Sequence, residues 1–283
     1  MYNMSILIDY NQVSIANLMQ QPEDDVGIDL FRHMVLQSIK YYRTKFINEF
    51  GEVIICCDNK NYWRKKIFPQ YKINRKRTKQ YQTRDWDMVF KCLNQIREEL
   101  KENFPYVVLE ILTAEADDII GVLSEHITED TVIVSGDKDF LQLQKFDHIS
   151  QYSPNRRDMI ETDDAAEYKR VHILKGDPGD GVPNFLSPDN TFEDRIRQTP
   201  LSNRKIKEWA GLEPKIFCDY KMLRYYERNR NLIDLDYVPD DIRENILSDY
   251  KYQLNNGYGD RSKLLPYFIE HRLKQLTEVI DEF

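Results

Sequence analysis

Nine carboxylate side chains are the residues of this sequence with the clearest capacity for chemistry. They fall into five groups, which are Asp9, Asp58, Glu115 with Asp117 and Asp118, Asp137 with Asp139, and Asp177 with Asp180. Carboxylates gathered in one small site repel one another, so such a site needs bound cations. Oxygen ligands select hard divalent ions such as Mg²⁺ or Mn²⁺, and two such ions can activate a water against a phosphodiester bond. If the nine residues converge, they predict a two-metal site for phosphodiester hydrolysis.

A basic and aromatic segment at about residues 60–86 forms a second group suited to chemistry. Residues 60–84 contain ten Lys or Arg and no Asp or Glu, although the whole chain carries a net charge of −8. Cations interleaved with aromatic rings neutralise phosphates and stack on bases. The side chains expected to contact nucleic acid are Trp63, Arg64, Tyr71, Lys72, Arg75, Lys76 and Arg77. Two alternatives stay open, a solvated charged run or rings that anchor the segment to the body.

These residues can act together only if the fold brings them to one place. Short apolar runs rich in Ile and Val predict four buried strands, at Ser5–Ile8, Glu52–Cys57, Tyr106–Leu112 and Thr131–Val134. Apolar residues at helical spacing predict helices between them, at Asp29–Phe50, Asp87–Glu102 and Ala116–His126. This alternation predicts an α/β fold, with a mainly parallel central sheet and helices on both faces. Because the carboxyl ends of parallel strands share one edge, where open sheets bind ligands, the acidic groups should meet there.

The simplest alternative is that each acidic residue caps a helix or shapes a turn. A single Asp at a strand end usually does so, and residues 115–118 would also favour the dipole of a helix that begins there. Caps alone do not explain five acidic groups at one predicted edge, so the metal-site interpretation is favoured. The histidines at positions 33, 126, 148, 172 and 271 are scattered without metal or triad spacing. We therefore expect a metal-activated water, with no protein nucleophile.

The second half of the chain differs from the first. After about Val182 the strand signal fades, and apolar spacing predicts helices at Ile206–Trp209, Ile216–Tyr225, Ile242–Tyr252 and Leu264–Ile280. We predict a nuclease domain over residues 1–185 and a smaller helical C-terminal domain over residues 186–283. Hydrophobic residues make up 41% and charged residues 31% of the chain, as in ordinary globular proteins.

Three features predict the cellular setting: the spacing of the cysteines, the length of the apolar runs and the residues at the N-terminus. The four cysteines show no paired spacing, which favours a reducing compartment. Apolar runs fall well short of the roughly 20 residues that cross a bilayer. A basic leader is also missing at the N-terminus. We expect a cytoplasmic protein without membrane contact, and a monomer, because no heptad pattern suggests obligate association.

In order along the chain, the acidic and basic motifs resemble those of the flap endonuclease (5′-nuclease) superfamily. The matching segments are Asp9, Asp58, Pro69–Arg75, Glu115–Asp118, Ser135–Phe140 and Lys175–Pro183. The likeness covers essentially the whole chain and is greatest to the ribonucleases H of T-even bacteriophages. This closer likeness rests on Trp63-Arg64, Asp85-Trp86-Asp87, Asn231–Asp240 and Asp281-Glu282-Phe283. Each motif is weak alone, but the ordered set is specific.

The resemblance implies a magnesium-dependent 5′ to 3′ exonuclease and flap endonuclease. Such an enzyme removes RNA primers and adjoining DNA from nicked or flapped duplexes during replication. The segment at 60–86 would form an arch or bridge over the site, and the catalytic residues would be Asp9, Asp58, Asp137, Arg64 and Lys72. A first ion would be bound by Asp9, Asp58, Glu115, Asp117 and Asp137. A second ion would be bound by Asp139, Asp177 and Asp180, with Asp118 behind the direct ligands and Mn²⁺ able to replace Mg²⁺.

One feature departs from the wider family. Most members follow the Gly-Asp-x-x-Asp loop with a glycine-rich helix-hairpin that holds the downstream duplex, but Asn184–Asn203 contains no glycine. We therefore expect residues 186–283 to bind the duplex by other means. A single-stranded-DNA-binding protein or a sliding clamp is a candidate partner, in the host cytoplasm if a phage encodes the chain. Two alternatives are a catalytically inactive protein that binds nucleic-acid structures and a PIN-type ribonuclease. The basic segment and residues 176–182 argue against the latter.

Overall fold

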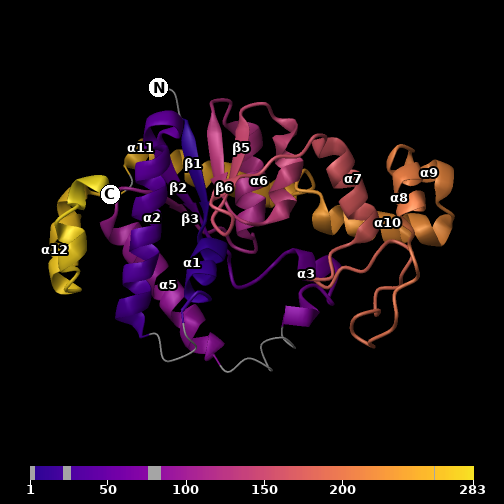
Figure 1. The fold of residues 1–283 in the computed structure, drawn as a ribbon, viewed down its shortest axis with the longest axis horizontal. Helices are drawn as coiled ribbons and strands as arrows, with labels where there is room; N and C mark the ends of the chain where they lie inside the picture. The colour runs from indigo at the N-terminus through magenta and orange to yellow at the C-terminus, as the bar shows by residue number, and fades with distance from the viewer. Residues whose placement is uncertain (1–3, 22–26, 76–83, 258) are drawn as a thin grey trace.

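The computed structural model describes residues 4–21, 27–75, 84–257 and 259–283. Within these ranges six strands form one sheet in the order β3-β2-β1-β4-β5-β6 (Figure 1). The strands are β1 (Ser5–Asp9), β2 (Glu52–Cys56), β3 (Val107–Leu109), β4 (Thr131–Val134), β5 (Ile149–Ser153) and β6 (Asp158–Met159). Strands β1 to β5 run parallel and β6 is antiparallel to β5. The predicted α/β fold is confirmed, and β5 and β6 extend the sheet beyond the four predicted strands.

The register of the central strands sets the level at which the acidic residues leave the sheet. Ile8 of β1 lies opposite Ile55 of β2 on one side and opposite Val134 of β4 on the other. The three strands therefore end together. Asp9 is the last residue of β1. Asp58 comes two residues after the end of β2, and Asp137 comes three residues after the end of β4.

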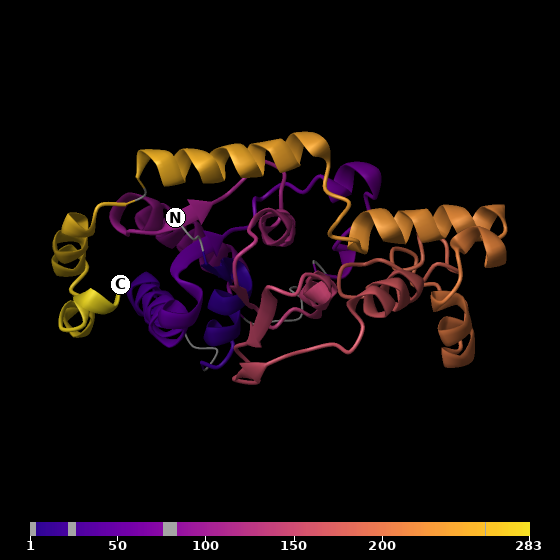
Figure 2. The ribbon, with the colours of Figure 1, turned by 90° about the horizontal axis from the view of Figure 1, so that it is seen from above.

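Helices cover both faces of the sheet because successive strand residues point to opposite sides. Ile6 and Ile8 belong to one apolar core and Leu7 to the other. The first face is covered by α1 (Tyr10–Leu18), α2 (Ile28–Phe50) and α5 (Trp86–Asn103). The second face is covered by α6 (Ala116–His126) and α11 (Asp240–Asn256), and Figure 2 shows α11 running along the outside.

A third apolar core lies at one end of the molecule. It joins the basic segment, through Phe68 and Tyr71, to residues 173–233. The helices involved are α7 (Ala165–Lys175), α8 (Asn203–Ala210), α9 (Pro214–Phe217) and α10 (Tyr220–Ile233). Both ribbon views place α8, α9 and α10 at this end and α12 (Leu264–Glu270) at the other (Figures 1 and 2). The remaining elements are α3 (Arg64–Ile67), α13 (Lys274–Thr277), η1 (Lys138–Lys145), η2 (Arg261–Lys263) and η3 (Ile280–Glu282).

The C-terminal helices are divided between these cores. Residues of α11 pack in the second core, and α12 packs with Phe283 in the first core, so both return to the sheet. Of the described C-terminal helices, α8 to α10 gather with α7 around the third core. The division into domains at residue 185 stays a prediction. Among the described residues, no helix is both long and apolar enough to cross a membrane.

Candidate active site and metal centre

Asp9 combines a capping role with a place at the centre of the site. Its Oδ1 accepts a hydrogen bond from the Gln12 amide at 3.1 Å, so it caps α1, and its Oδ2 accepts one from the Ser135 hydroxyl at 2.9 Å. The side chain is buried. Both carboxylate oxygens are thus fixed by the start of a helix and by the residue that follows β4. Each oxygen keeps acceptor capacity for a further ligand.

Asp58 is held in a similar way by neighbouring elements. Its Oδ1 accepts the amide of Ala116, the first residue of α6, at 2.8 Å. Its Oδ2 accepts the side-chain amide of Asn11 at 2.9 Å. The positive end of the α6 dipole therefore faces this carboxylate. Asn11 was not among the predicted site residues, and its position two residues after Asp9 is the only sequence signal that could have indicated it.

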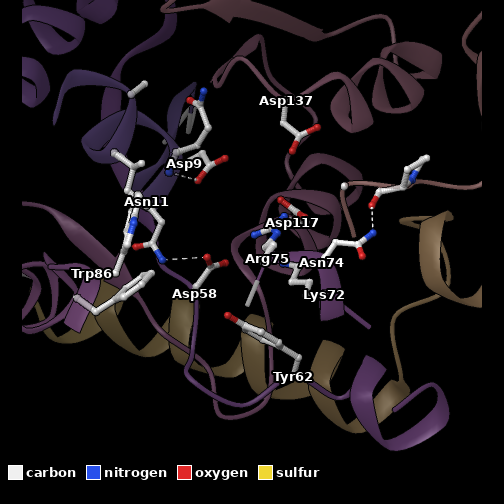
Figure 3. Close-up of a pocket in the computed structure, with 16 residues that line it drawn as sticks. Asp9, Asn11, Asp58, Tyr62, Lys72, Asn74, Arg75, Trp86, Asp117 and Asp137 are labelled. Atoms are coloured by element: carbon white, nitrogen blue, oxygen red, sulfur yellow. Dashed lines mark hydrogen bonds between the residues drawn. The ribbon is translucent and has the colours of Figure 1, made fainter. Parts of the chain in front are cut away.

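Four carboxylates from separate segments converge on one cavity. Asp9, Asp58, Asp117 and Asp137 line a cavity of about 720 Å³. Figure 3 shows their side chains pointing into this common space from the ends of β1 and β2, the start of α6 and the loop after β4. The convergence that strand order predicted is therefore present. Tyr62, Trp86 and Phe90 also line this cavity, although they were not among the predicted site residues.

A second cavity adjoins the remaining acidic residues. Asp137, Asp139 and Asp177 line a space of about 460 Å³ together with His172. Oδ1 of Asp137 accepts the Asp139 amide at 2.9 Å, and Oδ1 of Asp177 accepts the Gly179 amide at 2.7 Å. Asp137 lines both cavities, so it lies between the two groups of carboxylates.

Glu115 and Asp118 are buried in a network of cationic partners. Arg64 contacts Glu115 Oε2 at 2.9 Å and Asp118 Oδ1 at 2.8 Å, and its Nε donates to the Leu232 carbonyl. Asp118 Oδ2 also accepts the Trp63 indole N–H at 3.0 Å and the Glu115 amide at 2.8 Å. Asp118 therefore points back over the first turn of α6, away from both cavities. This position does not fit the predicted role of Asp118 as a metal ligand. It fits a supporting role behind the residues that would bind the ions directly.

The same network corrects the expected positions of Trp63 and Arg64. We expected these side chains to face nucleic acid, but only 5% of Trp63 and 1% of Arg64 is exposed. Trp63 lies in the core beneath α6, and Arg64 is surrounded by acceptors within the chain. Neither can stack on a base or reach a phosphate in this conformation. The anchoring alternative describes both residues.

Tyr71, Lys72 and Arg75 bind the loop that carries Asp180. The Tyr71 hydroxyl donates to Asp180 Oδ2 at 2.8 Å, and Arg75 forms an ion pair with Asp180 Oδ1. Lys72 contacts Glu115 and lies 3.9 Å from Asp180. Tyr71 is buried, so it does not present a stacking surface, whereas Arg75 is about half exposed. Lys72 and Arg75 both line the larger cavity.

The predicted contacts Lys76 and Arg77 lie outside the described residues.

The junction between the basic segment and the acidic loop depends on two unusual backbone positions. Lys72 has φ +59°, and its amide donates to the Asp180 carbonyl at 2.6 Å. Gly181 has φ +75°, and a Cβ added there would lie 2.9 Å from the Gln70 carbonyl oxygen. A residue without a side chain is therefore needed at 181 for this close approach.

The pKa shifts separate six of the carboxylates into two groups. In the first group, burial and then repulsion from Asp58 raise the pKa of Asp9 to about 7. Burial and the charge of Asp137 likewise raise the pKa of Asp117 and of Asp139 well above the ordinary value. Burial and Asp180 raise the pKa of Asp177. The common cause is negative charge that is desolvated without a cation beside it.

The second group has lysine and arginine partners. Burial acts against ionisation of Glu115, but Lys72 and Arg64 outweigh it and lower its pKa. Burial opposes ionisation of Asp180 as well, and Lys72 and Arg75 lower its pKa. These two carboxylates already have cationic partners within the chain, whereas those of the first group would gain most from an added cation.

An open α/β sheet with carboxylates and cationic side chains converging at its carboxyl edge defines a class of protein, the phosphodiesterases that work with divalent metal ions. Comparison with known proteins places the chain more narrowly. A family model for the 5′-3′ exonuclease N-terminal resolvase-like domain matches residues 18–172, and one for the C-terminal part of T4 RNase H matches residues 168–283. The chain belongs to this 5′-3′ exonuclease family.

Individual relatives agree with the family. The ribonuclease H of Enterobacteria phage T4 is 32% identical to the chain and aligns with 98% of it and 95% of its own length. The exonuclease of Escherichia phage T7 is 28% identical over 62% of the chain and 57% of its own length. The flap endonuclease of bacteriophage T5, solved with DNA and metal ions, shares the fold with a TM-score of 0.60 at 16% identity, over 87% of the chain and 99% of its own. The chain is a nuclease of the 5′-3′ exonuclease and ribonuclease H type, which decides against a PIN-type ribonuclease.

Proposed function

We propose that this nuclease uses two Mg²⁺ ions to remove RNA primers and adjoining DNA from the 5′ side of nicked or flapped duplexes during replication. The observation that carries the proposal is the convergence of Asp9, Asp58, Asp117 and Asp137 on one open cavity beside Lys72. The names of the phage T4 ribonuclease H and the phage T5 flap endonuclease support the choice of substrates.

The two cavities support the proposed division of metal ligands. The first ion would be held among Asp9, Asp58, Asp117 and Asp137, with Glu115 behind them. The second would be held by the acidic residues around the smaller cavity, Asp139 and Asp177, with Asp180 below. The donor set fits hard divalent ions, because every one of these ligands is a carboxylate oxygen. When bound, such ions supply an activated water and charge stabilisation of the leaving oxygen.

The side chains of the protein have their own tasks in this reaction. Asn11, Ser135 and the Ala116 amide hold the Asp58 and Asp9 carboxylates in fixed orientations. Arg75 and Lys72 lie at the cavity wall, where they would attract the phosphates next to the bond to be cut. Arg64 would act indirectly, by fixing Glu115.

Several finer expectations are part of the proposal. Lys76 and Arg77 would extend the phosphate contacts along the strand, and residues 186–283 would hold the duplex. A single-stranded-DNA-binding protein or sliding clamp would be the replication partner, and the enzyme would act as a monomer in the cytoplasm. Mn²⁺ would replace Mg²⁺ in the reaction, because it has similar ligand preferences.

The test is a cleavage assay in Mg²⁺ on a nicked duplex that carries a 5′-labelled RNA or DNA flap. The wild-type protein should release short 5′ products, and chelator should abolish them. Asp137→Asn should lower the rate at least about 100-fold, because metal sites lose 10–100-fold even from lesser changes. Asparagine still provides an acceptor for the Asp139 amide, so the local fold is retained.

Asp163→Asn is the matched control, because Asp163 is an exposed carboxylate that lines neither acidic cavity. It should cut at the wild-type rate. A wild-type protein that binds the flap but never cuts it in Mg²⁺ or Mn²⁺ would refute the proposal and favour the inactive structure-binding alternative.

A further inference from the structure

A histidine joins two of the carboxylates at the smaller cavity. One ligand atom from each of Asp139, His172 and Asp177 lies within 4.8 Å of the others. The Nδ1 atom of His172 is 3.3 Å from Oδ1 of Asp139, and 16% of the histidine side chain is exposed. Three donors at such spacing can bind one cation. Sequence spacing does not indicate this group, because position 172 is distant from 139 and the five histidines are scattered.

The three residues are held in place by the fold. Asp139 lies in the first turn of η1, and His172 lies in the last turn of α7. The Gly176 amide donates to the His172 carbonyl at 2.9 Å and ends α7, so that Asp177 follows at once. Gly176 has φ +69°, and a Cβ there would lie 2.5 Å from the Pro183 carbonyl oxygen. The imidazole and the carboxylate are therefore fixed relative to each other by the end of α7.

The simplest alternative is an ordinary ion pair between His172 and Asp139. The contact does not complete a hydrogen bond, since within the described part of the chain the buried Nδ1 atom of His172 has no hydrogen-bond partner. A buried polar atom without a partner is costly and rare, and each case needs an explanation. A cation shared with Asp139 and Asp177 would satisfy this nitrogen. The ion pair with Asp139, at 3.3 Å and without hydrogen-bond geometry, satisfies it only in part.

We propose that His172 is a direct ligand at the second metal position, which makes that position a mixed nitrogen and oxygen site that accepts Mg²⁺ but binds Mn²⁺ more tightly. This inference rests on the proposed two-metal function. Mg²⁺ prefers an all-oxygen shell, whereas imidazole suits transition metals, among which Mn²⁺ also accepts carboxylates. The first position offers carboxylates alone, so the two positions differ in metal preference.

The direct test is pulsed electron paramagnetic resonance of the wild-type protein loaded with Mn²⁺. Nitrogen-14 bonded to Mn²⁺ gives a hyperfine coupling that oxygen ligands do not give. We expect this coupling in the protein with two equivalents of Mn²⁺ bound. The measurement does not depend on any variant or on catalysis.

Variants then assign the nitrogen. His172→Gln keeps a polar side chain of similar size but offers an oxygen donor, so the coupling should disappear. Its Mn²⁺ affinity at one of two sites should fall at least about tenfold by calorimetry, while Mg²⁺ affinity should fall less. His126→Gln is the control, because His126 is exposed at the end of α6 and lies outside both cavities. It should retain the coupling and both affinities.

The outcomes separate this inference from the proposed function. Two bound Mn²⁺ ions without nitrogen coupling would overturn the role of His172 and leave the two-metal nuclease intact. Coupling that persists in His172→Gln would also overturn it. A protein that binds no Mn²⁺ and cuts no flap would refute the metal centre as a whole.

Discussion

The pKa of Asp9 leads to an unusual prediction, that removing a catalytic carboxylate stabilises the metal-free protein. Burial and repulsion from Asp58 raise the pKa of Asp9 from 3.8 to about 7. The folded state holds this proton more tightly than the unfolded state. The protonated carboxyl therefore contributes its full stability below the pKa of the unfolded state, and this contribution is lost as the pH rises through the pKa of the folded state. Three pKa units correspond to about 4 kcal/mol, which is an upper limit because neighbouring carboxylates titrate together.

Asp9→Asn removes this penalty while it keeps the local hydrogen bonds. Asparagine offers an acceptor to the Gln12 amide and a donor to the Ser135 hydroxyl, which are the two present partners. In chelator at about pH 8 the variant should therefore be more stable than wild type, by up to about 4 kcal/mol. For a chain of this size that raises the unfolding midpoint by on the order of 10 °C. At about pH 3 the difference should vanish, because the wild-type carboxyl is then mostly protonated in both states.

Thermal unfolding followed by circular dichroism, in chelator and in saturating Mg²⁺ across this pH range, measures the effect. Mg²⁺ should stabilise the wild type much more than the variant, because a ligand that binds only the folded state stabilises it more the more tightly it binds. Asp163→Asn, an exposed carboxylate, should change neither series. A variant that is less stable than wild type in chelator at every pH would refute the reasoning, and Asp9 would then act chiefly as the cap of α1.

Two further predictions concern the basic segment and its junction with the acidic loop. Gly181→Ala should destabilise the protein by about 1–3 kcal/mol, because a Cβ there meets the Gln70 carbonyl oxygen and φ is positive. Unfolding in urea measures this change. Unchanged stability would show that the loop can shift without cost. Trp63→Phe should cost about 1–3 kcal/mol by removing the hydrogen bond to buried Asp118, while affinity for a labelled flap measured by anisotropy in Ca²⁺ stays the same. Lost affinity with intact stability would instead assign Trp63 to base stacking.

The arrangement of the acidic site followed from the sequence because it depends on local rules. Short apolar runs separated by helices indicate a parallel sheet, and a parallel sheet places every carboxyl end at one edge. The parallel arrangement of the strands is enough to bring Asp9, Asp58 and Asp137 together. The competing interpretation as caps was also correct in part, since Asp9 caps α1 and Asp137 caps η1. A cap uses one lone pair of a carboxylate, so capping and metal binding do not exclude each other.

The parts that were not predicted depend on tertiary contacts. Strand β5, Ile149–Ser153, contains a buried Gln151 whose amide donates to the Ser135 and Asp137 carbonyls, so its polar residues hid its strand character. His172 reaches Asp139 only because α7 packs beside η1. Neither contact has a signature in sequence spacing, since both join residues that are distant along the chain.

The basic segment shows why composition could not decide between binding nucleic acid and supporting the site. A cluster of buried carboxylates attracts cations from any source, and the nearest source is the chain itself. Arg64 forms ion pairs with Glu115 and Asp118, and Lys72 forms one with Glu115 from the cavity side. A lysine or arginine near such a cluster has the same sequence signature whether its partner is a carboxylate or a phosphate. Burial separates the two cases, because fully enclosed Arg64 has only internal partners, whereas half-exposed Arg75 retains a face toward the cavity.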